Sequence, residues 1–523
     1  MALPDLANRR VSIAPDGSEH AIPTDAEVAA SFVDIAEAAR AHRLGGGQVV
    51  VVQGLGFVGA AVCAAVAGAS DLDGNPFHYV IGVDLPTAES YWKVAKLNSG
   101  LFPFEAPDVE LERVVADAVQ VRSNLSATAS EAAFALADVV MVDVNLDVGD
   151  PVVGSPGDIR VDLDGFREAI RAVGRNMRDD ALVLVETTVP LGTSERIVLP
   201  ILREERQRRG IDAPVFLAHA YERVMPGPNY LASVRAYHRT VSGIDEDSTA
   251  RARAFLSTFL DTTRYPLIEL PDARSTELAK LLENSYRAVN IAFIHEWTLL
   301  AEDVGVDLFA VIDAIRVRKG THDNMRYPGF GVGGYCLTKD SLLAQWGAAH
   351  LLASETALTT TLEALSINHR MPLHTLDLIA EVAEGDLHGK RIAVCGVAYL
   401  ADVGDTRNSP TETLVDALLA AGADVRLHDP SVRAWAERPD LPIAETIREA
   451  VAEADGVVFA VPHRAYRDLP ADELHAFARD GRFLVDAQNV ISDASAQLLH
   501  GRGWRVIGVG KGHWRKLGYH TPA

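Results

Sequence analysis

The chain contains very little cysteine for its length. Only three of its 523 residues are cysteines, Cys63, Cys336 and Cys395. They lie too far apart in the sequence to suggest a disulfide framework or a zinc site. No metal is therefore expected, and each cysteine has to be interpreted from its own surroundings.

Long apolar runs and excess positive charge are also absent. No run reaches the roughly 18 apolar residues that would span a bilayer, and the N-terminus contains no apolar stretch of signal-peptide length. We therefore expect a cytoplasmic protein without a membrane partner. A formal net charge of -23 argues against a nucleic-acid partner, because phosphate-backbone binding needs clustered lysine and arginine. It leaves room for an anionic small molecule, which a few local cations and helix N-termini can bind.

Hydrophobic residues make up 48% of the chain and charged residues 23%, as in globular proteins with substantial cores. The length favours two or three domains. Short apolar runs alternate with longer helical patterns, which predicts parallel strands with helices on both faces. The predicted strands are 48–52, 79–83, 139–144, 181–185 and 215–218 in the first half, and 390–394, 424–427, 456–461, 483–485 and 504–509 in the second.

The segment between these two alternations has a helical pattern. It predicts long helices over 276–304 and 341–367, with a glycine-rich loop at 328–334 between them. Another helix is predicted over 25–42, before the first strand. The expected fold class is α/β, with two Rossmann-like doubly wound domains joined by a central helical domain. The predicted boundaries are 1–46 for an N-terminal extension, 47–262, 263–375 for the helical domain, and 376–523.

A glycine fingerprint follows the first predicted strand. Gly54, Gly56 and Gly59 form a G-x-G-x-x-G turn, with Phe57 and Val58 before the last glycine. Such glycines permit a tight turn, admit a pyrophosphate and let helix and strand pack closely. Asp84, 25 residues after Gly59, ends the next strand, where a carboxylate accepts hydrogen bonds from ribose hydroxyls and repels a 2′-phosphate. The pattern predicts NAD as cofactor; a glycine-rich turn without a ligand is the alternative.

Two further motifs stand at the ends of predicted strands. Residues 186–193, ETTVPLGT, contain Thr188, whose hydroxyl can line a ligand crevice or simply belong to a turn and helix cap. Residues 219–227, HAYERVMPG, contain Glu222 and Arg223, which are candidates for the site or members of a plain ion pair.

Lys280 and Asn284 are four residues apart on the first long helix and therefore share a face. A lysine and an amide together can stabilise an alkoxide or a tetrahedral oxyanion, and a desolvated lysine can accept a proton. The alternative is a solvated charged face. The leucines and other apolar residues around them indicate a largely packed helix.

The sequence GFGVGGYCLTKD covers residues 329–340. Its glycines let the backbone approach a ligand closely, and Cys336 follows them where a new helix is expected. A helix N-terminus with Lys339 nearby stabilises a thiolate, and Asp340 can orient or activate water. A nucleophilic thiol beside an acid suits acyl-enzyme chemistry; a buried structural thiol is the alternative, and the preferred interpretation for Cys63 and Cys395.

The loop after Cys395 carries Arg407, which can clamp a phosphate with two hydrogen bonds or form a salt bridge within the loop.

Together these motifs resemble the UDP-glucose/GDP-mannose dehydrogenase family over roughly residues 47 to 515. The glycine-rich cysteine loop is the strongest match. The other matching segments are GLGFVG, Asn98-Ser99-Gly100 with Pro103 and Glu105, ETTVPLGT, YERVMPG, ELAKLLENSYRAVNIAFIHE and DTRNSP.

The resemblance implies an NAD-binding domain, a helical linker that builds a homodimer or higher homo-oligomer, and a second α/β domain that binds a nucleotide-diphosphate sugar, with a role in polysaccharide biosynthesis. It implies two successive hydride transfers from the sugar C6 alcohol, with a thiohemiacetal and then a thioester on Cys336. By this resemblance, Lys280 and Asn284 stabilise the oxyanions, and Asp340 and Glu222 handle water and protons. Thr188 lies at the reacting centre and Lys339 contacts the cofactor. The implied substrate contacts are Glu222, Arg223, Lys280, Asn284, Phe330, Gly333 and Arg407.

Several positions depart from the family pattern. Asn145 and Leu146 stand where a Val-Pro-Thr-like turn is usual, and Tyr335 precedes the cysteine where His or Ser is usual. His295 and Leu400 replace a common asparagine and lysine. These departures bear on the cofactor pocket and the sugar-nucleotide site.

Two other interpretations remain open. The first is a two-electron NAD-dependent alcohol dehydrogenase on the same scaffold, which has no need of Cys336. The second is an inactive nucleotide-sugar-binding protein, against which intact Cys336, Lys280, Asn284 and Asp340 speak.

Overall fold

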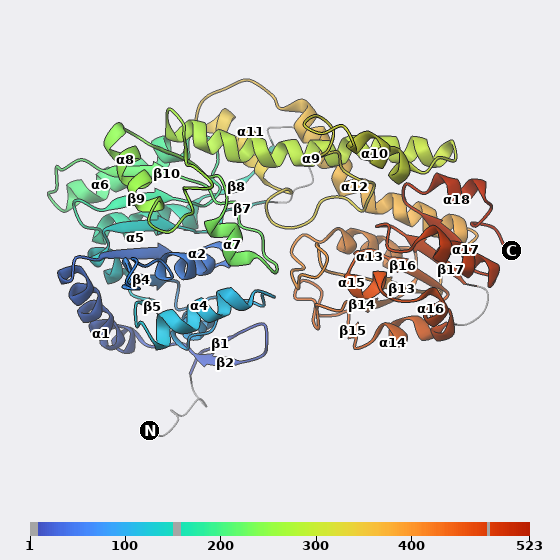
Figure 1. The fold of residues 1–523 in the computed structure, drawn as a ribbon, viewed down its shortest axis with the longest axis horizontal. Helices are drawn as coiled ribbons and strands as arrows, with labels where there is room; N and C mark the ends of the chain where they lie inside the picture. Colours follow the sequence, from blue (N-terminus) through green and yellow to red (C-terminus); the bar gives the residue numbers. More distant parts are fainter. Residues whose placement is uncertain (1–8, 150–157, 479–481, 523) are drawn as a thin grey trace. The chain divides into compact units, whose positions relative to one another are not determined.

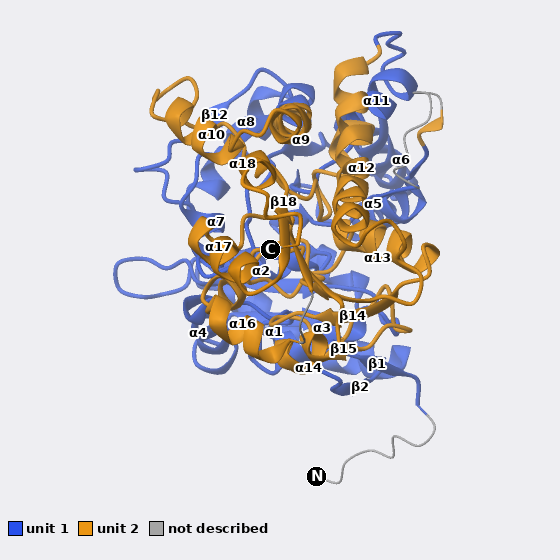
Figure 2. Cartoon of the chain, turned by 90° about the vertical axis from the view of Figure 1, so that its right-hand side faces the viewer, with its two compact units in different colours: residues 1–149, 160–281, 343–356 blue, residues 150–159, 282–342, 357–523 orange. Residues whose placement is uncertain are grey.

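The computed structural model describes residues 9–149, 158–478 and 482–522 (Figure 1). The chain forms two compact units, coloured separately in Figure 2. Unit 1 comprises residues 1–149, 160–281 and 343–356, and unit 2 comprises residues 150–159, 282–342 and 357–523. The division into four segments by residue number stays a prediction. Among the described residues, no helix is long and apolar enough to cross a membrane.

Unit 1 is built on an eight-stranded sheet of order β12-β11-β10-β9-β6-β3-β4-β5. All neighbouring strands are parallel except β10 and β11. From β3 the chain continues to β4 on one side of it, and β6 later pairs with β3 on the other side. The strand order therefore reverses between β3 and β6, and ligands bind at such a switch point in open parallel sheets. The strands are β3 Gln48–Gln53, β4 His78–Val83, β5 Leu125–Thr128, β6 Val139–Val142, β9 Leu182–Val185, β10 Phe216–His219, β11 Thr240–Gly243 and β12 Ile268–Glu269.

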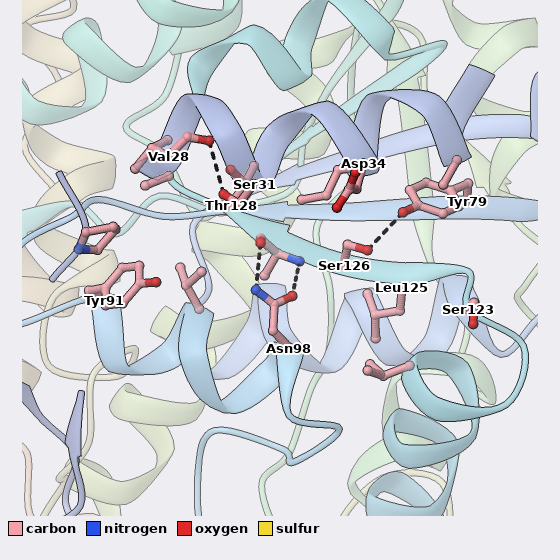
Figure 3. A pocket seen from close by; sticks show the side chains of 17 residues that line it. Val28, Ser31, Asp34, Tyr79, Tyr91, Asn98, Ser123, Leu125, Ser126 and Thr128 are labelled. Atoms are coloured by element: carbon pink, nitrogen blue, oxygen red, sulfur yellow. Dashed lines mark hydrogen bonds between the residues drawn. The ribbon is translucent and has the colours of Figure 1, made fainter. Parts of the chain in front are cut away.

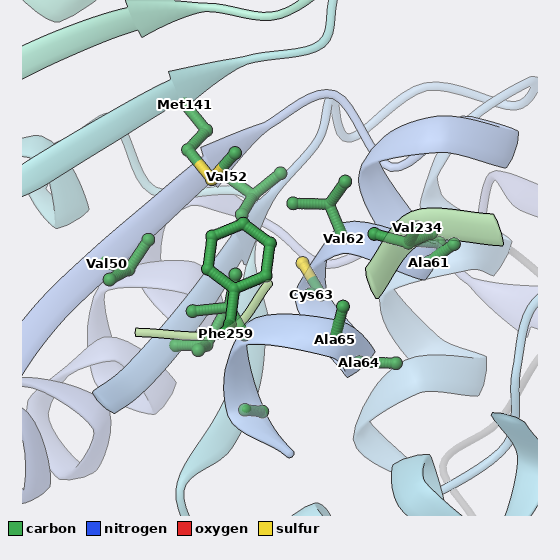
Figure 4. Packing of buried hydrophobic residues seen from close by; sticks show 14 of the residues in the cluster. Val50, Val52, Ala61, Val62, Cys63, Ala64, Ala65, Met141, Val234 and Phe259 are labelled. Carbon is green, nitrogen blue, oxygen red and sulfur yellow. The ribbon is translucent and has the colours of Figure 1, made fainter. Parts of the chain in front are cut away.

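Helices cover both faces of this sheet because successive strand residues point to opposite sides. Val50 and Val52 pack with α2 (Phe57–Ala67), α4 (Val109–Gln120) and α8 (Glu246–Leu256), as Figure 4 shows for part of this core. Val49 and Val51 pack with the other face. The remaining elements of unit 1 are β1 Val11–Ile13, β2 Glu19–Ala21, α1 Asp25–Leu44, α3 Tyr91–Asn98, η2 Glu131–Leu136, β7 Asp147–Val148, β8 Val161–Asp162, α5 Asp164–Asn176, η4 Ser194–Val198, α6 Leu199–Arg208 and α7 Tyr230–Arg235.

The N-terminal extension is part of unit 1. Its helix α1 begins with a capping box, in which the Thr24 side chain accepts from the Glu27 N–H and the Glu27 carboxylate accepts from the Thr24 N–H. Ala36 and Ala39 are buried in the core on one face of the sheet. The extension therefore covers a sheet face that would otherwise expose apolar side chains.

Unit 2 contains a second, all-parallel sheet of order β15-β14-β13-β16-β17-β18. Its strands are β13 Arg391–Cys395, β14 Asp424–His428, β15 Ile443–Ala444, β16 Gly456–Phe459, β17 Phe483–Asp486 and β18 Arg505–Gly508. The helices are α10 Leu308–Arg316, α12 Thr359–Val382, α13 Pro410–Ala420, α14 Ile447–Ala452, α15 Arg464–Arg467, α16 Ala471–Phe477, α17 Asp493–Gly501 and α18 Gly512–Lys516. Two Rossmann-like sheets and a helical region between them confirm the predicted fold class.

Four helices, α9 to α12, lie between the two sheets in the sequence. Helix α9, Ala273–Asp303, confirms the helix predicted over 276–304, and α11 is Asp340–His350. The single helix predicted over 341–367 is wrong, because α11 ends at His350 and α12 begins only at Thr359. Between them Ala353 adopts φ +53°, a left-handed conformation that ends a helix. The sequence did not reveal this break, because the apolar pattern continues from one helix to the next.

Candidate active site

The glycine turn of unit 1 fits a dinucleotide. Gly54 has φ +94°, and a Cβ there would lie 2.6 Å from the carbonyl oxygen of Asp143. A Cβ on Gly59 would overlap the carbonyl oxygen of Gly54, whereas a Cβ on Gly56 would meet nothing within 4 Å. The protein's own packing thus requires Gly54 and Gly59, and Gly56 leaves open space where a pyrophosphate needs it.

Helix α2 begins directly after this turn, with Phe57 and Val58 in its first turn. No side chain caps its N-terminal N–H groups, which therefore remain suited to an anion. The Phe57 ring stacks on Phe104 with 4.0 Å between centroids, and its carbonyl accepts a hydrogen bond of 2.7 Å from Tyr230. These contacts hold the start of the helix in place.

Asp84 follows β4 beside the glycine turn. One carboxylate oxygen accepts from the Leu55 N–H at 3.0 Å and pairs with Lys93 at 2.7 Å, and the other accepts from the Leu85 N–H. The predicted ribose-binding acid therefore also stabilises the turn that holds the fingerprint.

Lys280 is buried rather than part of a solvated face. It is 7% exposed, and its ammonium donates to the Glu222 carbonyl at 3.0 Å and lies 3.6 Å from the Glu222 carboxylate. Glu222 follows β10 and is itself 8% exposed. Arg223 instead packs over Tyr221 and Tyr237 and donates to the His238 carbonyl. Thr188 is half-buried, three residues beyond the end of β9.

Two buried acids of unit 1 were not among the residues predicted from the sequence. Asp143 follows β6, is 5% exposed, and has no hydrogen-bond partner for either carboxylate oxygen among the described residues. Glu186 follows β9, is fully buried, and pairs with Arg239. Burial raises the pKa of both acids. A charged residue directly after an all-apolar strand was the only sequence signal for Asp143.

Glu277 on α9 anchors the loop that follows Thr188. Its carboxylate accepts from the Gly192 N–H at 2.6 Å and from the Ser194 N–H at 2.8 Å. Burial raises the pKa of Glu277 to about 7. Glu277 precedes Lys280 by three residues on the same helix, but its role as an anchor of the loop emerges only from the structure.

The cysteine loop lies in unit 2, and Cys336 is exposed while Cys63 and Cys395 are buried. Helix α11 begins at Asp340, and the N–H groups of Lys339 and Asp340 donate to the Cys336 carbonyl at 3.2 and 3.0 Å. Cys336 therefore sits one turn before the helix rather than within its first turn. Burial raises the pKa of the Cys63 and Cys395 thiols, as expected for structural residues.

The loop before Cys336 is packed against unit 2. The Phe330 ring is 2% exposed and belongs to the apolar core of this unit, so it anchors the loop. A Cβ on Gly333 would lie 2.7 Å from Tyr399 and Pro410. Burial, and next the charge of Asp405, raises the pKa of Tyr399 to about 12.

Asp340 and Asn284 are brought together within unit 2. The Asn284 amide donates to the Asp340 carboxylate at 2.6 Å, and both residues are buried. The hydroxyls of Ser285 and Ser341 lie 2.9 Å apart in the next position of both helices. Asn284 is one helical turn after Lys280 on α9, as the spacing predicted.

Arg407 forms the loop salt bridge that was the alternative interpretation, with Asp405 at 2.7 Å. Its guanidinium also lies 5.6 Å from the ring centre of Tyr335, over which the Lys339 ammonium lies at 3.6 Å. Tyr335, one of the departures, thus holds two cations next to Cys336.

The other departures differ in environment. Asn145 is exposed, whereas Leu146 is 1% exposed and belongs to the core of unit 1. Leu400 is 47% exposed. His295 is half-buried with its ring 5.9 Å from His374, and burial lowers its pKa to about 4.

A cavity of about 470 Å³ in unit 1 contains none of the predicted site residues (Figure 3). It lies between α1, α3 and the edge strand β5. The Asn98 amide makes two hydrogen bonds to the backbone of Ala127 there, and Tyr79 bonds Ser126 at 2.9 Å. Asn98 therefore covers polar groups of an edge strand that would otherwise be unpaired.

Three domain models of one family match the chain. The NAD binding domain matches residues 48–259, the central domain residues 274–369, and the UDP binding domain residues 393–493. A UDP-N-acetyl-D-mannosamine dehydrogenase of Methanocaldococcus jannaschii is 27% identical over 475 residues, which cover 90% of this chain and 99% of the relative. The enzyme of the same name from Escherichia coli is 25% identical, with 84% and 98% covered.

Solved structures agree with these matches. An NDP-N-acetyl-D-galactosaminuronic acid dehydrogenase from Methanosarcina mazei shares 30% identity and a TM-score of 0.74, with 92% of this chain and 98% of the other covered. A UDP-D-ManNAc dehydrogenase from Pyrococcus horikoshii gives 26% identity and a TM-score of 0.75, with 89% and 100% covered. With its glycine turn, its second parallel sheet and its cysteine loop, the chain belongs to the UDP-glucose/GDP-mannose dehydrogenase family, an NAD-dependent group of oxidoreductases.

Proposed function

We propose that this protein oxidises the C6 alcohol of a nucleotide-diphosphate sugar to a carboxylate, through a covalent intermediate on Cys336. The observation that carries the proposal is the contrast among the three thiols. Cys336 alone is exposed, in a loop that the buried Phe330 ring anchors and directly before helix α11. An exposed thiol near a helix start and two cations is suited to act as a thiolate.

NAD bound at the glycine turn would accept one hydride in each of two oxidation steps. The residues suited to hold it are Gly54, Gly56 and Gly59 with the first turn of α2, Asp84 for the ribose, and Lys339 and Thr188 nearer the reacting atoms. Open space at Gly56 and the uncapped start of α2 support this assignment.

The first oxidation removes a hydride from C6 and a proton from its hydroxyl, which leaves an aldehyde. The Cys336 thiolate then adds to the aldehyde carbon, and the oxyanion takes a proton to give a thiohemiacetal. The second oxidation removes another hydride and the hydroxyl proton, which leaves a thioester. Water attacks the thioester carbon and releases the carboxylate and the free thiol.

The chain's own polar groups would stabilise these steps. Lys280 is desolvated and held by Glu222, so its position is defined before substrate binds. The Asn284 amide is oriented by Asp340, and we assign both Lys280 and Asn284 to the oxyanions. Asp340 and Glu222 would manage water and protons. Arg407 would bind the diphosphate, oriented by Asp405, with Arg223 and Gly333 as further substrate contacts.

We further propose a UDP-linked 2-acetamido hexose as substrate. The support is the match of residues 393–493 to a UDP binding domain and the names of the relatives, which refer to N-acetylated sugars. A place in polysaccharide biosynthesis and a cytoplasmic location stay predictions.

The test is to count NADH formed per sugar consumed with UDP-N-acetylmannosamine, UDP-N-acetylgalactosamine, UDP-N-acetylglucosamine, UDP-glucose and GDP-mannose. Two NADH per sugar with a carboxylate product on an acetamido sugar is the expected result. One NADH per sugar would establish a two-electron dehydrogenase, and none with any sugar would favour a binding protein.

We also propose that α9 mediates a homodimer. Large apolar side chains are exposed at helical spacing along α9, which is unusual for a surface helix. They are Leu282, Tyr286, Phe293, Trp297 and Leu300, and the exposed Val304 follows directly after the helix. A second copy of the same helix offers a matching apolar surface.

Light scattering would test the dimer. The double change Phe293→Glu and Trp297→Glu should give a monomer, because two carboxylates would be buried in the interface. Val121→Glu is the matched control, since Val121 is an isolated exposed residue at the end of α4. A wild-type monomer, or a double variant that stays dimeric, would refute this assignment.

A further inference from the structure

The carboxylate of Asp143 occupies an unusual position in unit 1. Asp143 follows β6 at the switch point of the sheet, where its backbone lies against Gly54 and its Cβ lies near Gly59. The residue is 5% exposed, and neither oxygen has a hydrogen-bond partner among the described residues. An ionised carboxylate in such a place would lack both water and donors, at a large cost in free energy.

Glu186 is its lateral neighbour. Val142 pairs with Val185 in the parallel register of β6 and β9, so the next residue on each strand, Asp143 and Glu186, lie side by side. One Glu186 oxygen pairs with Arg239, and the other has no hydrogen-bond partner among the described residues. One carboxyl proton placed between them would give each residue a hydrogen-bond partner.

The charges around Asp143 also favour a protonated carboxyl group. Three carboxyl groups, Asp143, Glu186 and Glu222, follow β6, β9 and β10 in turn, the strands that lie side by side in the sheet. Two cations from other elements accompany them, Arg239 before β11 and Lys280 on α9. Two further titratable groups lie nearby, the Cys63 thiol on α2 and the His219 ring at the end of β10. Burial raises the pKa of the thiol and lowers that of the ring to about 3, so neither adds a charge at neutral pH. Three acids with two cations leave one uncompensated negative charge.

We propose that Asp143 carries a proton in the folded protein at neutral pH and donates it as a hydrogen bond to Glu186. Asp143 is then a positioning residue: it fixes Glu186 and Arg239, and it leaves Lys280 as the ion-pair partner of Glu222. Burial, and next the charges of Glu186 and Glu222, raises the pKa of Asp143 well above its usual value, in keeping with this assignment. Only the catalytic consequence, the placement of Glu222 and Lys280 at the reacting site, rests on the proposed function.

Infrared spectroscopy of the unliganded protein tests the proton directly. A protonated carboxyl group gives a C=O band separate from that of a carboxylate. The expected result at neutral pH is a band that shifts when aspartate is labelled with 13C and is lost in Asp143→Asn. The difference between the two proteins isolates Asp143 from other acids with raised pKa, such as Asp486 and Glu277.

Asp429→Asn is the matched control from unit 2. Asp429 is also buried after a strand, but its carboxylate accepts from the N–H groups of Val397 and Ala398 and pairs with His463. It should be ionised, so its replacement should leave the carboxylic-acid band unchanged. A band that survives in Asp143→Asn, or that shifts only with labelled glutamate, would overturn the assignment to Asp143.

The pH dependence of unfolding gives a second readout. An acid whose pKa is raised on folding keeps its proton in the native state while the unfolded chain releases it, so stability falls as pH rises above the unfolded pKa. Over that range the unfolding constant of the wild type should rise by up to about tenfold per pH unit relative to Asp143→Asn. Parallel curves for the two proteins would refute the raised proton affinity.

Kinetics separate positioning from mere packing. Asn can still donate a hydrogen bond to Glu186, whereas Leu cannot and would leave a buried acceptor unpaired. We expect kcat to fall by about tenfold or more in Asp143→Leu, with rescue in Asp143→Asn and a changed alkaline limb of the pH profile. Equal losses in both variants would contradict the role. Should the Leu variant not fold, the infrared difference between the wild type and Asp143→Asn still decides whether Asp143 carries the proton. Absence of NADH with every sugar would defeat only the proposed function.

Discussion

In both parallel sheets, a carboxylate after the second strand accepts a hydrogen bond from the turn after the first strand. In unit 1, Asp84 accepts from the Leu55 N–H. In unit 2, Asp429 accepts from both Val397 and Ala398, and it also pairs with the buried His463. The same topology thus places a partly accessible carboxylate in one sheet. In the other sheet the carboxylate is buried, and groups of the protein supply its hydrogen bonds.

The two turns also lead into different elements. In unit 1, α2 begins at Phe57, directly after the glycine turn. In unit 2, the chain continues from Gly396 through a loop to Ser409 before α13 begins at Pro410. The first turn therefore presents a helix N-terminus to a phosphate, whereas the second offers side chains such as Arg407. The two sheets thus share a strand order but differ in the length of the first connection, and this length determines which groups the turn presents.

The largest expected effect concerns Cys336 in unit 2, and it tests whether unit 1 binds the cofactor while unit 2 supplies the nucleophile. Cys336→Ser should reduce carboxylate formation by about a thousandfold or more, because a hydroxyl is a far weaker nucleophile at neutral pH. NADH per sugar measured in single turnover should fall toward one. Cys395→Ala, in the second sheet, is the control and should keep activity near the wild-type level. Two NADH per sugar in Cys336→Ser would exclude the thioester route.

Substitutions in the first glycine turn should separate ligand binding from folding. Gly56→Ala meets open space in the unliganded protein, so Tm should shift by about 2 °C or less while KM for NAD rises by about 10- to 100-fold. Gly59→Ala would clash with the Gly54 carbonyl and should lower Tm clearly. Thermal unfolding and steady-state kinetics distinguish the two, and an unchanged KM in Gly56→Ala would argue against the assigned pyrophosphate position.

Asp84 and Asp429 occupy equivalent positions in the two sheets, but their replacement should have different consequences. Asp84→Asn should raise KM for NAD by about tenfold, because an amide binds ribose hydroxyls less well than a carboxylate. Asp429→Asn should leave that KM unchanged and destabilise the fold by about 2 kcal/mol, because its amide N–H groups would face buried donors. Titration with NAD and denaturant unfolding measure both. Equal effects on NAD binding would mean that the two acids serve the same purpose.

The smallest effect concerns acid sensitivity. Hydrogen bonds and the charge of His463 outweigh burial and lower the pKa of Asp429. An acid whose pKa is lowered on folding contributes stability above its unfolded pKa, and this contribution is lost as the pH falls through the folded pKa. The wild type should therefore lose Tm between neutral pH and about pH 3 more steeply than Asp429→Asn. Parallel Tm curves would show that Asp429 is not held ionised.

Much of the fold could be predicted from the sequence because its signals are local. The apolar runs predicted most strands of both sheets to within a few residues, and the helical pattern of α9 was correct to within three residues at its ends. Strands β5 and β11 were missed, because their sequences, LSAT and TVSG, mix apolar with polar or small residues. The break between α11 and α12 was missed, because an apolar pattern does not report a single left-handed residue such as Ala353. The short strands, β12 and β15 among them, carry too few residues for a pattern.

By itself, the sequence determined the fold class, the dinucleotide turn and the glycine-rich cysteine loop, since glycine spacing and period are properties of neighbouring residues. Only the tertiary structure decided which polar groups meet. Lys280 meets Glu222, Asn284 meets Asp340, and Asp143 meets Glu186, although each pair is separated by more than 40 residues in the chain. The physical reason is that strand register and helix packing, rather than distance along the chain, determine which side chains share a buried environment and so which of them keep their charge.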